Sequence, residues 1–473
     1  MQVYRRLTWL VIGLWLLYGL THLDYNGPFF DEAIYITAGQ RTLEGHGLSD
    51  GYLTWFGGHL LWPILAAAGY LGAGLLGTRV IALLLSLIAL LSLSRATRNL
   101  FGLRAAFWAT LAFALNGPFT ALARLGVYDT LALAGIAVSF WALTEMVRQD
   151  NRAWLIVAAL AYTIGLFAKY PMALMVVPLS GFILAERKRR SFLDLAIFAF
   201  TGGAVALALF LPSREQIAGL ATWRLGNSPD FGVTLPTIAY AVFYYSASTL
   251  VLALGGWLAA RRDRFLATVL LFSLAIWPAY HLLLSDPVST NKHLVFGFLF
   301  AHPLVGLALE KLWERRPRLL PLRRLAVIGL VLMLTAVGYV QLEQSHRAWP
   351  DVRPAAAYLV THVEPGEDLL INESWPYTMY LYTEGRIDSP WDVYDGYRLT
   401  NGELEGDLCE VAWFVDSGGS FEWPDGVVET IQGCGTFEAV FSSKSTMTGL
   451  ANDFRFHVAP VEVVIWRNSG EAS

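Results

Sequence analysis

The chain has 473 residues, of which 55% are hydrophobic and only 15% charged, and its mean hydropathy is +0.47. Soluble domains carry about 25% charged residues, so this composition excludes an ordinary soluble protein and indicates a membrane protein. The net charge of −4 is divided unevenly: residues 1–342 hold 16 acidic and 27 basic side chains, and residues 343–473 hold 22 acidic and 7 basic. This division predicts a membrane body followed by an acidic aqueous domain, with no nucleic-acid partner.

The membrane body contains twelve apolar windows, most of them close to the roughly 20 residues that cross a bilayer as a helix. They lie near 7–23, 60–76, 78–94, 105–121, 130–147, 153–168, 171–185, 192–211, 235–260, 265–284, 294–310 and 325–342. Six basic clusters separate them, near 4–6, 95–104, 148–152, 186–190, 261–264 and 310–324. All six fall on one side only if 60–76, which contains Pro63 and three glycines, does not cross. Basic loops favour the cytoplasm, so we expect eleven transmembrane helices and a cytoplasmic N terminus.

The segment 24–77 then becomes the first external loop, and its part 60–76 is expected to form an interfacial or re-entrant helical pair. Residues 343–473 form an extracytoplasmic α/β domain, with a helix near 353–363 and strands near 411–416, 437–443 and 461–467. Cys409 and Cys434 are the only cysteines of the chain. They predict one disulfide in an oxidising compartment, with two free thiols as the alternative.

The expected fold class is therefore an all-α polytopic membrane protein of about eleven transmembrane helices plus juxtamembrane helices, with a small C-terminal extracytoplasmic α/β domain. Its two domains are a transmembrane domain, 1–342, and a soluble domain, 343–473. The expected location is the plasma or inner membrane, where membrane lipids surround the first domain.

Charged residues on the external side of this topology suggest a chemical task. The acids are Asp31, Glu32 and Asp129, and the bases include Arg124, Lys169 and Lys292, with His293 beside the last. Cations can hold a phosphate and stabilise it as a leaving group, while a carboxylate takes a proton from a hydroxyl. A lipid-phosphate sugar at headgroup depth would use both.

Each of these residues also has a purely structural interpretation. Asp31 and Glu32 could cap a juxtamembrane helix, because acids favour helix N termini. Asp129 could pair with Arg124, and Lys169 could extend to the membrane interface. His59 could be an interfacial histidine.

Four motifs in order resemble the GT-C glycosyltransferases, in the branch of the protein O-mannosyltransferases and the lipid A aminoarabinose transferases. They are "DEAIY" after the first helix, "ARLGVYDTLAL", "GLFAKYPMALMVVP" and "NKHLVFGFLFAHPL". The resemblance covers about residues 1–345. Relatives often carry a lysine and two prolines where "GGHLLWP" offers His59, and Arg-Tyr in place of Lys292–His293.

The resemblance implies a polyprenyl-phosphate or dolichyl-phosphate sugar donor and an active site on the extracytoplasmic face. It implies catalytic roles for Asp31, Glu32 and Asp129, with Asp31 as the base. The donor phosphate would be held by basic residues, here Arg124, Lys169, Lys292, His293 and His59. Some relatives bind a divalent metal ion, for which Glu32, His59 and His293 could supply ligands, although no dense metal-binding spacing is present.

We therefore expect an inverting glycosyltransferase that transfers a sugar from a polyprenyl-phosphate donor to an extracytoplasmic hydroxyl of a cell-envelope lipid, polysaccharide or protein. One alternative is a transporter or flippase of a lipid-linked anionic substrate, which would need inverted repeats and charges within the crossings. The other is a non-catalytic subunit of an envelope-assembly complex, which would tolerate the loss of Asp31.

Overall fold

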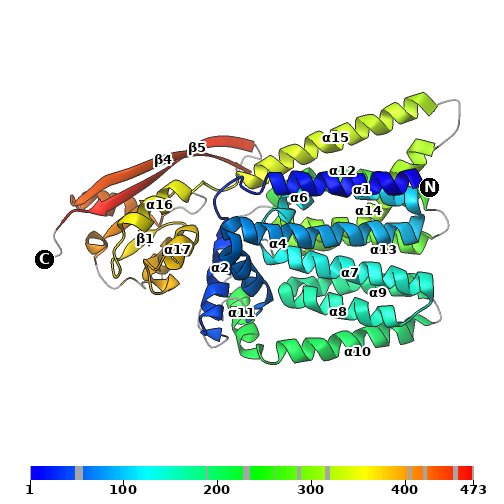
Figure 1. The fold of residues 1–473 in the computed structure, drawn as a ribbon, viewed down its shortest axis with the longest axis horizontal. Helices are drawn as coiled ribbons and strands as arrows, with labels where there is room; N and C mark the ends of the chain where they lie inside the picture. Colours follow the sequence, from blue (N-terminus) through cyan, green and yellow to red (C-terminus); the bar gives the residue numbers. More distant parts are fainter. Residues whose placement is uncertain are drawn as a thin grey trace.

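The computed structural model of the chain describes residues 2–47, 57–187, 190–226, 235–260, 263–284, 289–314, 320–400, 402, 404, 407–418, 423–450 and 456–470. Long helices lie side by side in a bundle, and a sheet-containing domain sits at the end of the bundle away from the N terminus (Figure 1).

The helices of the bundle are mostly apolar and are separated by short connections. They are α1 (Gln2–Thr21), α2 (Phe30–Leu43), α4 (Leu61–Phe101), α5 (Leu103–Ala114), α6 (Gly117–Ala123), α7 (Tyr128–Gln149), α8 (Ala153–Ala168), the 3₁₀ helix η2 (Tyr170–Met175), α9 (Val176–Arg187), α10 (Ser191–Phe210), α11 (Arg214–Gly226), α12 (Leu235–Ala259), α13 (Arg264–Leu284), α14 (Thr290–Glu314) and α15 (Leu320–His346).

Seven helices of the described residues are long and apolar enough to cross a membrane, and the bent pair α5–α6 would make an eighth. The chain is therefore an integral membrane protein, but the expected number of eleven crossings is not confirmed. The difference lies partly in short helices such as α8, which is apolar but has only 16 residues. At about 1.5 Å per residue, a helix of that length is shorter than the bilayer core.

Helix α4 is a hairpin and not one straight rod. Its helical path breaks at Ala73 and Gly74, where Gly74 has a φ of +61°. The Thr78 hydroxyl donates to the carbonyl of Ala66 at 2.7 Å, which a continuous helix would not allow at a separation of twelve residues. A methyl group on Gly77 would lie 2.0 Å from the carbonyl oxygen of Gly69 on the other arm, so the close approach of the two arms requires a glycine at position 77. The pair expected within 60–76 is thus only one short arm, residues 61–72, and the second arm continues to Phe101 in an apolar helix long enough to cross.

Ion pairs join the basic connections at the end of the bundle that holds the N terminus (Figure 1). Arg104 at the start of α5 pairs with Glu314 at the end of α14. Arg187 pairs with Asp194 at 2.7 Å, and Arg152 pairs with the same carboxylate at 2.8 Å. These described members of the basic clusters therefore lie on the side opposite the acidic pair of α2.

The C-terminal part contains a five-stranded sheet in the order β2-β1-β3-β5-β4. The first three strands are parallel neighbours and the long β4–β5 hairpin is antiparallel. The elements are α16 (Arg353–His362), β1 (Leu369–Ile371), α17 (Ser374–Thr383), η5 (Pro390–Asp392), β2 (Val393–Tyr394), α18 (Gly396–Thr400), η6 (Leu408–Glu410), β3 (Trp413–Asp416), α19 (Val427–Gly433), β4 (Phe437–Leu450) and β5 (Phe456–Asn468). The predicted helix near 353–363 and the three predicted strands are present, whereas α17 and β2 were not expected.

Two further sequence expectations concern the same region. Cys409 and Cys434 are joined by a disulfide whose Cα atoms are 5.5 Å apart. The expected domain boundary after residue 342 falls inside the last turn of α15, which continues to His346. That boundary remains a prediction.

Helix α17 attaches the sheet domain to α2. Gln40 Nε2 donates to the Thr383 hydroxyl at 3.2 Å, and the Tyr382 hydroxyl donates to Glu44. The Arg41 guanidinium lies 5.9 Å from the Tyr382 ring centroid. The sheet domain thus packs on the helix that begins with the acidic pair.

Glu373, between β1 and α17, is a buried carboxyl group. It is 4% exposed, and its Oε2 atom has no hydrogen-bond partner among the described residues. Burial raises the pKa of Glu373 to about 7, because desolvation disfavours the charged form.

We predict that Glu373 makes the protein less stable as pH rises from about 4.5 to about 7. In this interval the folded state keeps a proton that the unfolded state has released, so ionisation favours unfolding. Glu373→Gln should flatten this part of the curve of melting temperature against pH, measured by tryptophan fluorescence, and exposed Glu343→Gln should not. A wild-type curve that already rises over this interval and is unchanged by Glu373→Gln would contradict the prediction.

Candidate functional site

The first turns of α2 and α14 bring an acid and a base together. Lys292 Nζ donates to Asp31 Oδ2 at 2.7 Å, and it lies 5.0 Å from the ring centroid of Phe29. The Lys292 side chain is 8% exposed, whereas the Asp31 side chain is 28% exposed. Asp31 therefore presents a carboxylate that solvent or a substrate can reach.

A second acid–base pair lies at the start of α7 and the end of α8. Lys169 Nζ donates to Asp129 Oδ1 at 2.5 Å, and both side chains are buried. The second carboxylate oxygen, Oδ2, has no hydrogen-bond partner among the described residues. Asp129 thus pairs with Lys169 and not with Arg124, which was the structural alternative suggested by the sequence.

These two pairs form one cluster at one end of the bundle. Electrostatic interactions link Lys169 to Asp31 and to Lys292, and they link Lys292 to Asp129. Two carboxylates and two ammonium groups therefore converge from α2, α7, α14 and the junction of α8 with η2. We call Asp31, Asp129, Lys169 and Lys292 the charged cluster.

Aromatic rings surround the charged cluster. Lys169 Nζ lies 4.8 Å from the ring centroid of Tyr128, a cation–π contact, and the His59 ring meets Tyr128 and Tyr170 edge-on at 5.4 and 5.3 Å. Burial lowers the pKa of His59 to about 4, and the nearby Lys169 charge acts in the same direction. His59 is therefore neutral at pH 7. Tyr128 and Tyr170 were not singled out from the sequence, although Tyr128 directly precedes Asp129 and Tyr170 directly follows Lys169.

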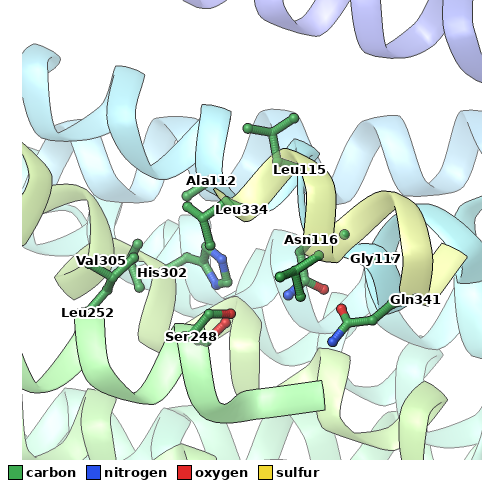
Figure 2. A pocket seen from close by; sticks show the side chains of 13 residues that line it. Ala112, Leu115, Asn116, Gly117, Ser248, Leu252, His302, Val305, Leu334 and Gln341 are labelled. Carbon is green, nitrogen blue, oxygen red and sulfur yellow. The ribbon is translucent and has the colours of Figure 1, made fainter. Parts of the chain in front are cut away.

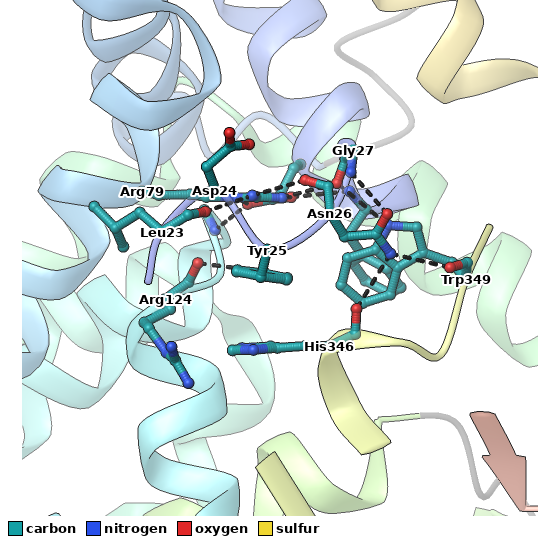
Figure 3. A network of polar contacts seen from close by, with 12 residues as sticks. Leu23, Asp24, Tyr25, Asn26, Gly27, Arg79, Arg124, His346 and Trp349 are labelled. Carbon is teal, nitrogen blue, oxygen red and sulfur yellow. Dashed lines mark hydrogen bonds and ion pairs between the residues drawn. The ribbon is translucent and has the colours of Figure 1, made fainter. Parts of the chain in front are cut away.

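Arg79 is the central residue of a buried network beside the charged cluster (Figure 3). Its guanidinium has five N–H groups, and all of them are used. Two donate to Glu32, at 2.9 and 2.8 Å, and the others donate to the carbonyls of Leu23, Asn26 and Gly27. No role was predicted for Arg79 from the sequence, and its position in an apolar segment was the available signal.

Glu32 is saturated with hydrogen-bond donors. Besides the two bonds from Arg79, it accepts from the backbone N–H of Gly126 at 2.6 Å and from that of Phe29 at 2.8 Å. The side chain is fully buried. Adjacent Asp31 and Glu32 therefore have different environments: Asp31 is accessible, whereas Glu32 joins the first external loop, α4 and the loop before α7.

Two predicted phosphate ligands are placed apart from the cluster. Arg124 Nη1 donates to the His22 carbonyl at 3.2 Å, and its guanidinium lies over the Tyr18 ring at the end of α1. His293 is next to Lys292 in sequence, but its Nδ1 atom lies 3.0 Å from His281 Nε2, and its ring packs 4.5 Å from Trp277 on α13.

The residues suggested for a divalent metal do not form a metal site. Among the described residues, no three His, Cys, Asp or Glu side chains are grouped so that they could hold a metal ion. The Glu32 carboxylate already accepts four hydrogen bonds, and His293 packs against α13. We therefore assign no reaction step to a metal.

A small internal cavity lies elsewhere in the bundle, between α5, α6, α12, α14 and α15. Its volume is about 10 Å³, enough for roughly one water molecule. Polar side chains of Asn116, Ser248, His302 and Gln341 line it (Figure 2). No residue of the charged cluster lines this cavity, and it is too small for a sugar.

Comparisons with known proteins support the fold expected from the sequence. A family model described as dolichyl-phosphate-mannose-protein mannosyltransferase matches residues 60–214. No curated protein sequence matches the chain.

Solved structures match over almost the whole chain. ArnT from Cupriavidus metallidurans bound to undecaprenyl phosphate is 16% identical with a TM-score of 0.59, and the match covers 98% of each chain. The apo oligosaccharyltransferase of Archaeoglobus fulgidus is 11% identical with a TM-score of 0.55, over 96% of this chain and 74% of that one. The arabinofuranosyltransferase AftD from Mycobacteria is 17% identical with a TM-score of 0.53, over 98% and 41%. The resemblance to GT-C glycosyltransferases is thus confirmed, and the chain has their fold.

We predict that Glu32→Gln strongly destabilises the protein, because it leaves the buried Arg79 guanidinium without a counter-charge. Breaking one partner of a buried ion pair costs about 3–5 kcal/mol. Glu343→Gln is the control, since it removes an exposed pair with Arg347 and should cost less than about 1 kcal/mol. Melting temperatures in detergent measure both effects, and equal melting temperatures for the two variants would contradict the role given to the network.

Proposed function

We propose that the protein is an inverting glycosyltransferase that moves a sugar from a polyprenyl-phosphate donor to a hydroxyl of an extracytoplasmic acceptor. The observation that carries this proposal is the charged cluster, in which a reachable carboxylate lies beside two ammonium groups. The fold shared with ArnT, whose solved structure holds undecaprenyl phosphate, supports the donor class.

Asp31 is the proposed base. Among the three candidate acids it is the most exposed, at 28% of its side chain, because Glu32 and Asp129 are fully buried. A base must come within hydrogen-bond distance of the proton that it removes, which the buried acids cannot do without movement. Glu32 would then act by positioning α2, and Asp129 by positioning Lys169.

Lys292 and Lys169 are the proposed phosphate ligands. Each ammonium group has three N–H donors, and one carboxylate contact uses only part of that capacity. A phosphate monoanion between them would be held by charge-assisted hydrogen bonds. The same contacts would stabilise the charge that develops on the phosphate as it leaves.

The reaction then balances as a single displacement. The acceptor oxygen attacks the anomeric carbon from the face opposite the phosphate, and its proton passes to Asp31. The bond between that carbon and the phosphate oxygen breaks, and its electron pair leaves with polyprenyl phosphate. One reachable carboxylate suffices for inversion, whereas retention needs a second group as a nucleophile.

An apolar groove gives the donor's lipid chain a place near Lys169. It lies between α8, α9 and α10 and has a volume of about 320 Å³. Its lining is mostly aliphatic and aromatic, and it includes Val176, seven residues after Lys169. A polyprenyl tail in this groove would remain in the bilayer while its phosphate reaches the charged cluster.

The proposed orientation places the charged cluster outside the cytoplasm. Basic residues gather at the opposite end of the bundle, as the positive-inside tendency requires of cytoplasmic loops. The disulfide in the C-terminal domain suits an oxidising compartment. Because this domain packs on α2, it is the proposed surface for selecting the envelope acceptor.

We predict that Asp31→Asn lowers sugar transfer at least about a hundredfold, because the amide cannot take the acceptor's proton. The measurement uses purified protein in detergent, a panel of radiolabelled polyprenyl-phosphate sugars and a cell-envelope extract as acceptor. Asp24→Asn is the matched control, since Asp24 is an exposed carboxylate of the same loop that pairs with Arg353. Its transfer rate should equal that of the wild type.

Other results of the same experiment would indicate a different base or one of the two alternative functions. Transfer that survives Asp31→Asn would remove the base from Asp31. A wild-type protein that moves labelled donor across a vesicle membrane without transferring sugar would be a transporter. A wild-type protein that binds no donor, and an Asp31→Asn variant that still supports envelope assembly in cells, would indicate a non-catalytic subunit.

A further inference from the structure

Arg124 is a buried cation that lies outside the charged cluster. Its side chain is 2% exposed, and its Nε and Nη2 atoms have no hydrogen-bond partner among the described residues. No carboxylate of these residues forms an ion pair with it, and the nearby Glu343 pairs with Arg347 at 3.1 Å. The His22 carbonyl and the Tyr18 ring contact Arg124 but do not neutralise its buried charge, which carries a desolvation penalty, so this arrangement favours an anionic ligand.

His346 supplies a second free group at the same place. It ends α15, is 4% exposed, and its Nε2 atom has no partner among the described residues. Helices α6 and α15 pack so closely that a methyl group on Gly117 would lie 2.6 Å from the Gly338 carbonyl oxygen. Arg124 and His346 follow at the ends of these two helices.

The ring of Tyr25 separates this place from the Arg79 network. The Arg79 guanidinium lies over the ring at 4.2 Å, and the His346 ring stacks on it at 3.6 Å. Two groups this close to one ring must occupy opposite faces. Figure 3 shows the Arg124 and His346 side chains on one side of Tyr25 and Arg79 on the other.

We propose that Arg124 and His346 form a second phosphate-binding site, separate from the charged cluster. The two free guanidinium nitrogens present adjacent donors in one plane, which matches two oxygens of a phosphate group. The imidazole Nε2 adds a third donor when the ring is doubly protonated, because the other ring nitrogen hydrogen-bonds the Ala121 backbone carbonyl. The ligand class is a phosphate ester or free phosphate.

A membrane phospholipid is one source of that phosphate. Helices α1 and α15, which border the site, expose large apolar side chains near it, among them Leu14, Leu17, Tyr339 and Val340. An acyl chain could therefore lie along these helices while the headgroup reaches Arg124. Free inorganic phosphate carries the same chemistry without the chains.

The test measures phosphate ligands on the full-length protein. Native mass spectrometry of delipidated protein, titrated with phosphatidylglycerol, should show one lipid whose occupancy falls about tenfold or more in Arg124→Gln and also falls in His346→Gln. Arg214→Gln is the control, because Arg214 is a mostly exposed arginine at the same end of the bundle. Thermal shift with inorganic phosphate forms a second arm.

The outcomes separate the sources and the sites. Lipid retention that depends on Arg124 and His346, with no phosphate shift, assigns a lipid headgroup. A phosphate shift that is smaller in both variants than in Arg214→Gln assigns a free anion, and the shift that remains belongs to the charged cluster. Equal binding by the wild type and both variants in both arms overturns the site. Asp31→Asn should leave the part of the binding that depends on Arg124 and His346 unchanged, so a failure of the proposed transfer reaction would not affect the result.

Discussion

The buried ion pair between Arg79 and Glu32 is the interaction on which the site depends. Arg79 fixes the carbonyls that lead into α2, and Glu32 fixes the backbone N–H before α7. Three segments that are distant in sequence therefore have one geometry at the point where Asp31 and Asp129 begin their helices. The same loop reaches the C-terminal domain, since Asn26 donates to the carbonyls of His346 and Trp349 at 3.1 and 3.0 Å.

This network explains why two adjacent carboxylates stand beside a membrane. In the first turn of a helix, successive side chains point in different directions, so Asp31 and Glu32 cannot share one environment. Glu32 points inward to Arg79, and the cost of burying its carboxylate is offset by four hydrogen bonds, two from Arg79 and two from backbone N–H groups. Asp31 turns to Lys292 and remains reachable. The structural interpretation of helix capping therefore applies to Glu32, and the chemical one is proposed for Asp31.

Much of the fold could be predicted because it follows from strong local signals. Apolar windows and charge division predicted a membrane bundle with a separate acidic domain, and the glycines with Pro63 indicated that the helix beginning at Leu61 is interrupted, although not that its second arm extends to Phe101. Cys409 and Cys434 are the only cysteines of the chain, so they could form only one intramolecular disulfide. The number of crossings was less predictable, since a helix such as α8 is shorter than a typical span.

The partners within the site could not be predicted from spacing. Arg124 precedes Asp129 by five residues and was the structural partner suggested by the sequence, whereas Lys169 follows it by 40 residues. The packing of α7 against α8 makes Lys169 the ion-pair partner of Asp129. Arg79 lies in an apolar run, where nothing local identifies Glu32 as its partner 47 residues away. The resemblance grouped His293 with Lys292 as a phosphate ligand, and the packing of its ring on Trp277 of α13 could not be read from the spacing. Such choices depend on tertiary packing.

The most direct test of the account is a cryo-electron microscopy structure of the protein in nanodiscs with undecaprenyl phosphate. We expect phosphate density in contact with Lys169 and Lys292, close to the Asp31 carboxylate, with the Arg79–Glu32 pair intact. Phosphate bound only beside Arg124, or a lipid phosphate remote from Asp31, would contradict the assignment of the charged cluster as the donor site.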